Sequence, residues 1–450
     1  MGEDDPFEEV NEYWKKKVHE RDLRETKWPR DVPDITLRWM NAFLKSEVEE
    51  FNMKRIGSTE ISRIFRVKAR QKGLKPASFV IEFSNGDDAN DQLWRKAYRN
   101  LVVFRQEFAN SNPTSPHTIA AKYNPQQPLK FCTISEDVLV DENILQFPDW
   151  ATTGMNAHFA HMMYDSLAKT HGAFFAHAGV EKGLLVAGGF VADSRFSPAY
   201  TDAISAFFDA SAVVDDMVVD DAHHGLPIRD IYSSLAAKPL QHPIPSLFGA
   251  HGREIVAECF RRCGRRPLTL CHGELHAGHS FMDVRTNEFT FAGWRLVSAA
   301  PPGTDLAVGL LTALQPCTKQ QIKGIVQHYY ASLVASGADE DAYPFEHCWE
   351  DFLLGCILWC CTYPAFEVAR LLTGPATVAG DAEFYLPRVY NRMVRNAIEL
   401  DLDSFALSLL PTSTPSPRAA ARSRQPNKPT SAPLKPAPKA GKVKVQVPFT

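Results

Sequence analysis

A change in periodicity near residue 150 is the feature that most constrains the fold of this 450-residue chain. The first third contains strand-like runs such as "ISRIFRVKAR" at 61–70 and "ASFVIEF" at 77–83, joined by the Gly-containing link "QKGLK". From "NAHFAHMMYDSLAKTHGAFFAH" at 156–177 onward, most segments up to about residue 409 have apolar residues at helical spacing. This order predicts an α+β fold with two lobes, a small β-rich N-lobe and a large, mainly helical C-lobe.

Within this layout, helices are expected at 34–51 and at about 91–108. A Pro-rich loop follows the second helix, and two strands are predicted at 130–140 and 143–147. In the helical part, "LTLCHGEL" and "FTFAGWRLV" read as short strands of a hairpin-like insert.

The last 40 residues differ in composition from the rest. They contain nine prolines and eight basic residues but no acidic ones, so they are expected to be disordered. Such a tail could bind protein partners through polyproline segments. The expected domains are a charged N-terminal extension at 1–33, the N-lobe (nucleotide lobe) at 34–140, the C-lobe at 141–410 and a basic Pro-rich tail at 411–450.

Charge and composition exclude several functional classes. Outside the tail, 41 basic residues oppose 53 acidic ones, and this net charge of −12 argues against a nucleic-acid-binding core. No apolar run is long enough to span a membrane, and the acidic start lacks the apolar segment of a secretory signal. Nine scattered cysteines indicate reduced thiols, so a cytoplasmic location is expected.

The segment "CHGELHAGHSFMD" at 271–283 has the pattern of a phosphotransferase catalytic loop. Further local matches precede and follow it: "SEDV" at 135–138, "DSLAKTHGAFFA" at 165–176 and "GTDLAVGLL" at 303–311. In this order they resemble the small-molecule branch of the protein-kinase-like fold, which includes aminoglycoside phosphotransferases, choline kinases and the ecdysteroid-kinase-like CHK group. The resemblance implies ATP-dependent phosphotransfer to a hydroxylated small molecule bound between the lobes.

The same resemblance implies the role of each loop position. Glu274 stands where the family has the Asp that acts as base, and the alternative for it is a buried acid bonded to loop amides. His272 is implied to be architectural. His279 and Gly293 occupy the two metal-ligand positions, where an imidazole is a softer ligand than Mg²⁺ prefers and glycine offers none. Asp283 could substitute as a ligand, but both Mg²⁺ and Mn²⁺ are in doubt.

The nucleotide lobe departs from the family pattern as well. Glu136 and Asp137 match the hinge between the lobes, whereas Glu82 falls at the position of the phosphate-binding Lys. We hypothesise that Glu82 and Arg99 form a charge-swapped version of the usual Lys–Glu pair. Asp305 is expected to cap the helix that begins at Leu306.

Three functions remain open from the sequence. The joint substitutions favour a catalytically impaired pseudokinase that acts by binding a small molecule or a partner. The first alternative is an active phosphotransferase that uses Glu274 as base, with Asp283 or His279 holding a metal. The second is an interaction scaffold that works through the basic tail.

Overall fold

The computed structural model describes residues 28–29, 31–58, 62–84, 98–124, 130–147, 153–181, 244, 251–373, 388–389 and 391–411. Those up to Leu409 belong to one compact unit. Most of the predicted N-terminal extension and nearly all of the predicted tail lie outside the described residues. Among the described helices, none has the length and hydropathy that a membrane span requires.

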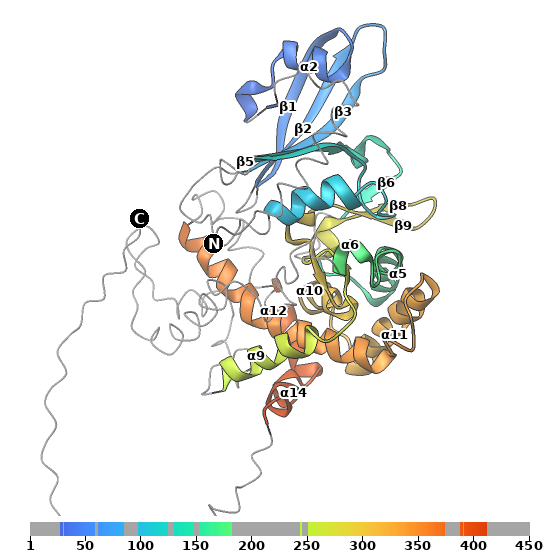
Figure 1. The fold of residues 1–450 in the computed structure, drawn as a ribbon, viewed down its shortest axis with the longest axis vertical. Coiled ribbons are helices and arrows are strands. Elements are labelled where there is room, and N and C mark those ends of the chain that lie inside the picture. The colour runs from blue at the N-terminus through green and yellow to red at the C-terminus, as the bar shows by residue number, and fades with distance from the viewer. Residues whose placement is uncertain are drawn as a thin grey trace, which may run out of the picture. The chain divides into compact units, whose positions relative to one another are not determined.

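The N-lobe is built on a five-stranded antiparallel sheet (Figure 1). Its spatial order is β1-β2-β3-β5-β4, so the strand from the hinge side, β5, lies between β3 and β4. The strands are β1 (Val48–Ser58), β2 (Ser62–Gln71), β3 (Ala77–Ser84), β4 (Thr118–Asn124) and β5 (Lys130–Glu136).

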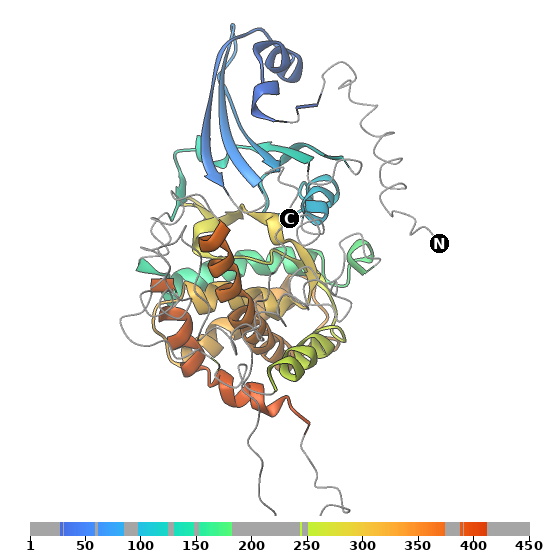
Figure 2. The ribbon, with the colours of Figure 1, turned by 90° about the vertical axis from the view of Figure 1, so that its left-hand side faces the viewer.

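One face of this sheet carries the N-lobe core. Helix α2 (Leu37–Leu44) packs there, and Figure 2 shows it on one side of the long blue strands. Thr36 accepts a hydrogen bond from the Trp39 amide at 3.2 Å, which caps the start of the helix. Trp39 and Met40 pack against strand residues of the same face, including Val67, Phe79, Ile81 and Phe83. Because side chains alternate along a strand, Glu82 of β3 points to the opposite face.

The helix before β4 connects the two lobes. Its last part, Phe104–Phe108, is a π-helix, and the Phe104 ring stacks on Trp294 of the C-lobe with centroids 4.4 Å apart. Asn100 on the same segment donates from Nδ2 to the carbonyl of Val297 at 3.1 Å. The helix therefore rests directly on the loop that follows the predicted catalytic segment.

The C-lobe combines helices with two small sheets. One sheet pairs β7 (Thr269–Cys271) with β10 (Ser298–Ala300), and the other has the order β6-β8-β9, formed by β6 (Ile144–Gln146), β8 (Ser280–Asp283) and β9 (Glu288–Phe291). Its helices include α5 (Ala157–Ala173), α6 (Ala178–Glu181), α9 (Gly252–Cys263), α10 (Leu306–Thr312), α11 (Lys319–Ala335), α12 (Phe345–Thr373) and α14 (Leu402–Ser408).

The predicted fold class, α+β with a β-rich first lobe and a helical second lobe, is confirmed. Three local predictions were wrong. The helix expected at 34–51 ends at Leu44 and is followed by β1, and β4 lies in the segment expected to be a loop. The two strands expected to pair as a hairpin belong to different sheets, because β7 pairs with β10 while β9 pairs with β8.

Candidate functional site

The 271–283 loop is anchored to the start of α10 by Asp305. The buried Asp305 carboxylate accepts hydrogen bonds from the His272 amide at 2.6 Å and the Gly273 amide at 2.7 Å. Gly273 has φ +84°, and a Cβ there would lie 2.1 Å from the carbonyl oxygen of Leu296, so only glycine fits. Asp305 is the N-cap residue of α10, as expected, but its side chain makes no capping hydrogen bond to the helix, since its oxygens bind the loop instead.

Asp305 also belongs to a buried group of hydrogen-bonded side chains that sequence reasoning missed. His171 of α5 contacts Asp305 through Nε2 at 3.2 Å and the Tyr329 hydroxyl through Nδ1. Burial acts to raise the pKa of Asp305, but the hydrogen bond and charge of His171 lower it below its usual value. The Cys271 thiol completes a group of three ligand atoms within 4.8 Å of one another. Because both His171 nitrogens and both Asp305 oxygens already have partners, this group does not fit a metal ion.

Glu274 is bound by a cation from the next turn. Its two carboxylate oxygens accept from Nε and Nη2 of Arg295 at 2.5 and 2.6 Å, and both side chains are more than four-fifths buried. Burial acts to raise the pKa of Glu274, but Arg295 holds it below its usual value. The carboxylate is thus ionised and bound at both oxygens by a guanidinium rather than by loop amides, which was the alternative expected from the sequence.

His272 holds the loop against the strand that follows it. Its Nε2 donates to the carbonyl oxygen of Ala292 at 2.7 Å, and its ring lies against Trp294 with centroids 4.6 Å apart. Burial and the neighbouring His279 lower the pKa of His272 to about 4. The imidazole is therefore neutral near pH 7.

His279 fills the space beside Gly293. Gly293 has φ +77°, and a Cβ built on it would lie 2.8 Å from Nε2 and Cδ2 of His279. The imidazole is held by a hydrogen bond from Nδ1 to the Glu274 carbonyl at 3.1 Å and by stacking on His276, with ring centroids 4.0 Å apart. An acidic side chain at 293 would therefore overlap this ring.

Asp283, the predicted substitute ligand, is engaged elsewhere. It lies at the end of β8 and forms an ion pair with Arg285 at 2.7 Å, which lowers the pKa of Asp283 to about 2. Asp141 contacts the same guanidinium at 2.9 Å. Together with the glycine at 293 and the imidazole at 279, this pairing leaves a set of donors that does not fit Mg²⁺, which prefers several free oxygen ligands.

At the predicted hinge, both carboxylates have structural partners. Asp137 is buried, accepts from the Ser78 hydroxyl at 2.7 Å and forms an ion pair with Arg66 at 2.8 Å. Glu136 accepts from the amide of His117 at 2.8 Å. These contacts fix the end of β5 against the sheet.

Glu82 lies on the same face of the sheet as Ser78, toward the other end of β3. Its carboxylate accepts a hydrogen bond from the Ser62 hydroxyl at 2.6 Å. It also acts electrostatically on Arg105 of the π-helix. The hypothesis of a Glu82–Arg99 pair stays a prediction, whereas Arg105 is a residue that sequence reasoning missed. The signal for it was a single Arg within the apolar run "LVVFRQEF" at 101–108.

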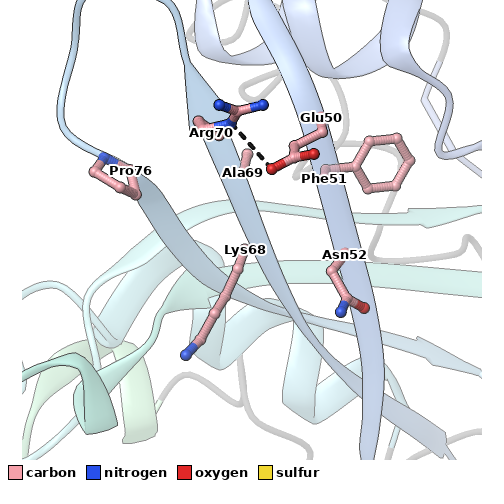
Figure 3. Close-up of a pocket in the computed structure, with 7 residues that line it drawn as sticks. All are labelled: Glu50, Phe51, Asn52, Lys68, Ala69, Arg70 and Pro76. Carbon is pink, nitrogen blue, oxygen red and sulfur yellow. Dashed lines mark ion pairs between the residues drawn. The ribbon is translucent and has the colours of Figure 1, made fainter.

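A separate pocket of about 390 Å³ lies over β1 and β2 (Figure 3). Arg70 and Glu50 form an ion pair at 3.0 Å on its wall, and Lys68 and Asn52 also line the pocket. None of the site residues predicted from the sequence lines this pocket.

Among solved structures, this chain is similar to several kinases and phosphotransferases. An ethanolamine kinase from Plasmodium vivax matches at 12% identity and a TM-score of 0.47, over 91% of this chain and 98% of that one. A choline/ethanolamine kinase family protein from Mesorhizobium loti matches at 13% identity and a TM-score of 0.37, over 80% and 92%. A macrolide 2'-phosphotransferase type I matches at 13% identity and a TM-score of 0.41, over 78% and 98%.

By their names, all three are small-molecule kinases or phosphotransferases. This is the group that the sequence motifs resemble. No protein-family model matches the chain, and no curated protein does either. Identities of 12–13% with TM-scores below 0.5 transfer no activity to this chain.

Proposed function

We propose that this protein is a kinase-like binding protein that holds a small molecule between its lobes and has lost metal-dependent phosphotransfer. The observation that carries the proposal is the bidentate Glu274–Arg295 pair. A base for phosphotransfer must accept a proton from the substrate hydroxyl at hydrogen-bond distance. In Glu274 both oxygens are occupied by a guanidinium, and its lowered pKa makes it a weaker proton acceptor.

The metal positions support the same function. Phosphotransfer from ATP relies on metal ions that neutralise charge on the phosphates. Here the volume next to residue 293 is taken by the His279 ring, and Asp283 is paired with Arg285. By contrast, the anchoring of the loop through Asp305 and Gly273 keeps the backbone shape of the site. A loop that keeps its backbone shape but offers no free metal ligands suits binding of a small molecule better than catalysis of phosphotransfer.

The test is a phosphotransfer assay on the full chain with ATP and either Mg²⁺ or Mn²⁺. Ethanolamine, choline and a macrolide serve as acceptors, and Glu274→Gln provides the background because it removes the carboxylate while preserving its shape. We expect the wild-type rate to equal the Glu274→Gln rate for each acceptor. Turnover that requires both the metal and Glu274 would instead establish the active phosphotransferase.

A further inference from the structure

Arg105 is a buried cation whose donors are not all used. Only 6% of the residue is exposed, and its neighbours on the helix, Phe104 and Phe108, are buried as well. Its Nε and Nη1 atoms have no hydrogen-bond partner within the part of the chain that the structure describes. Buried polar atoms are nearly always paired, and an unpaired donor of a charged group is especially costly. An acceptor group from outside the described residues would therefore satisfy Nε and Nη1 of Arg105.

Glu82, the charged residue that acts on Arg105, does not supply an acceptor to Nε or Nη1. Glu82 interacts with Arg105 electrostatically and opposes the lowering of the Arg105 pKa by burial. Its carboxylate, however, takes a hydrogen bond from Ser62, a neighbour across the β2–β3 pair. A guanidinium stays protonated in proteins, so the unmet donors of Arg105 cannot be removed by loss of a proton.

The position of Arg105 links it to the rest of the site. Its guanidinium carbon lies 5.6 Å from the centroid of the Phe104 ring, and that ring stacks on Trp294. Trp294 is the residue between Gly293 and Arg295, which hold the shape of the loop described above. Arg105 thus belongs to the helix segment that contacts the turn carrying the Glu274 partner, and Glu82 of β3 acts on it electrostatically.

We propose that Arg105 anchors an oxyanion of a small-molecule ligand, a phosphate or a carboxylate, without a divalent metal ion. The planar guanidinium donors match the oxygens of either group. The positive charge that a metal would otherwise provide is then contributed by a helix side chain, opposite in polarity to Glu82 on the strand. This inference rests on the proposed binding function and specifies the class of ligand.

The experiment measures binding to the full chain by calorimetry in EDTA, with pyrophosphate, ATP and malonate as probes. Comparing the phosphate probes with malonate identifies the type of oxyanion. Arg105→Met removes the charge at similar volume, and Arg105→Lys keeps the charge but loses the planar donors. Lys68→Met is the matched control, because it removes an exposed cation from the Figure 3 pocket on the N-lobe sheet, away from Arg105 on its helix.

We expect at least one probe to bind the wild type in EDTA, about 10- to 100-fold more weakly to Arg105→Met, with an intermediate loss for Arg105→Lys. Lys68→Met should change affinity less than about threefold. Thermal melts establish that each variant is folded, and Arg105→Met should melt no lower than the wild type because it removes buried donors that have no acceptor.

Two results would overturn the role of Arg105 while leaving a metal-free binding protein intact: equal binding by Arg105→Met, or a loss of binding in Lys68→Met as large as in Arg105→Met. Binding of no probe, or binding only with Mg²⁺, would also reject the inference. Phosphotransfer that depends on Glu274 is measured separately, and it would reject the proposed function even if Arg105 binds the oxyanion.

Discussion

The His279 ring fills the space that a side chain at position 293 would need. The positive φ of Gly293 and the imidazole 2.8 Å from its potential Cβ together exclude any side chain at 293. Restoring an acidic ligand there is therefore not a matter of one substitution. The substituted side chain would have to displace a ring that is held by stacking on His276 and by a hydrogen bond to the Glu274 carbonyl.

This coupling predicts an unequal response at two glycines. Gly73 has φ +71°, and a Cβ there would meet nothing within 4 Å, so Gly73→Ala bears only the backbone cost, about 1–2 kcal/mol. Gly293→Ala bears a similar backbone cost plus overpacking against His279, roughly 1–3 kcal/mol more. Chemical denaturation of the two variants measures the difference.

The double variant Gly293→Ala/His279→Ala isolates the steric part. If the ring is the obstacle, the two substitutions should be non-additive, with the double variant losing less stability than the sum of the single losses. Strict additivity would mean that the strain at 293 comes from the backbone alone.

The sequence identified these two positions only as substituted ligand sites. Their mutual exclusion could not be predicted, because it depends on the left-handed turn at Gly293 and on the path of a loop 14 residues earlier. The same holds for Glu274 and Arg295. The sequence contained the cation, but the pairing requires the turn at 294–296 that brings the two side chains together.

At the scale of elements, Asp305 ties the loop after β7 to the first turn of α10. Asp305→Asn keeps the shape but replaces one acceptor oxygen by a donor, which must then face a loop amide. The charge-assisted bonds from His272 and Gly273 are weakened, and we expect a loss of about 3 kcal/mol. Hydrogen exchange should accelerate at these two amides.

Asp339→Asn is the matched control, since Asp339 also accepts two backbone amides but lies on the surface. It should lose less than about 1 kcal/mol. Equal losses in the two variants would show that the buried position of Asp305 contributes nothing special to holding the loop.

The elements missed from the sequence have identifiable reasons. In β1 a register shift between Val48 and Glu50 interrupts the alternation of side chains. The partly buried Phe51 and Met53 then follow Val48 at offsets of three and five residues, which reads as neither a clean strand nor a clean helix. The π-helix at 104–108 adds a residue to its turn, so helical periodicity does not indicate where Arg105 points.

At the scale of the molecule, the lobes could be predicted because their signals accumulate over many residues. Strand-like composition in the first third and helical spacing in the rest survive errors at any single element. Contacts between distant segments carry no such signal. The stacking of Phe104 on Trp294 and the pairing of β7 with β10 join parts of the chain that only the folded structure brings together.

One such contact contributes a pH dependence to the stability of the protein. Asp351 of α12 is fully buried and accepts from the Tyr343 hydroxyl at 2.8 Å, with Arg266 at 3.4 Å. Burial raises the pKa of Asp351 to about 7, although Tyr343 and Arg266 act to lower it. The folded state therefore holds a proton at pH values where the unfolded Asp has lost it, so the free energy of unfolding falls as pH rises from about 4 to about 7.

Asp351→Asn removes this titration. Relative to the variant, the wild type should lose on the order of 4 kcal/mol of unfolding free energy between pH 4 and 7, with most of the change complete by pH 7. Urea denaturation at several pH values measures it. Glu346→Gln, on the same helix but exposed, should follow the wild-type profile. Parallel profiles for wild type and Asp351→Asn would mean that Asp351 is ionised in the folded protein, held by Arg266 as a buried ion pair that links α12 to the end of α9.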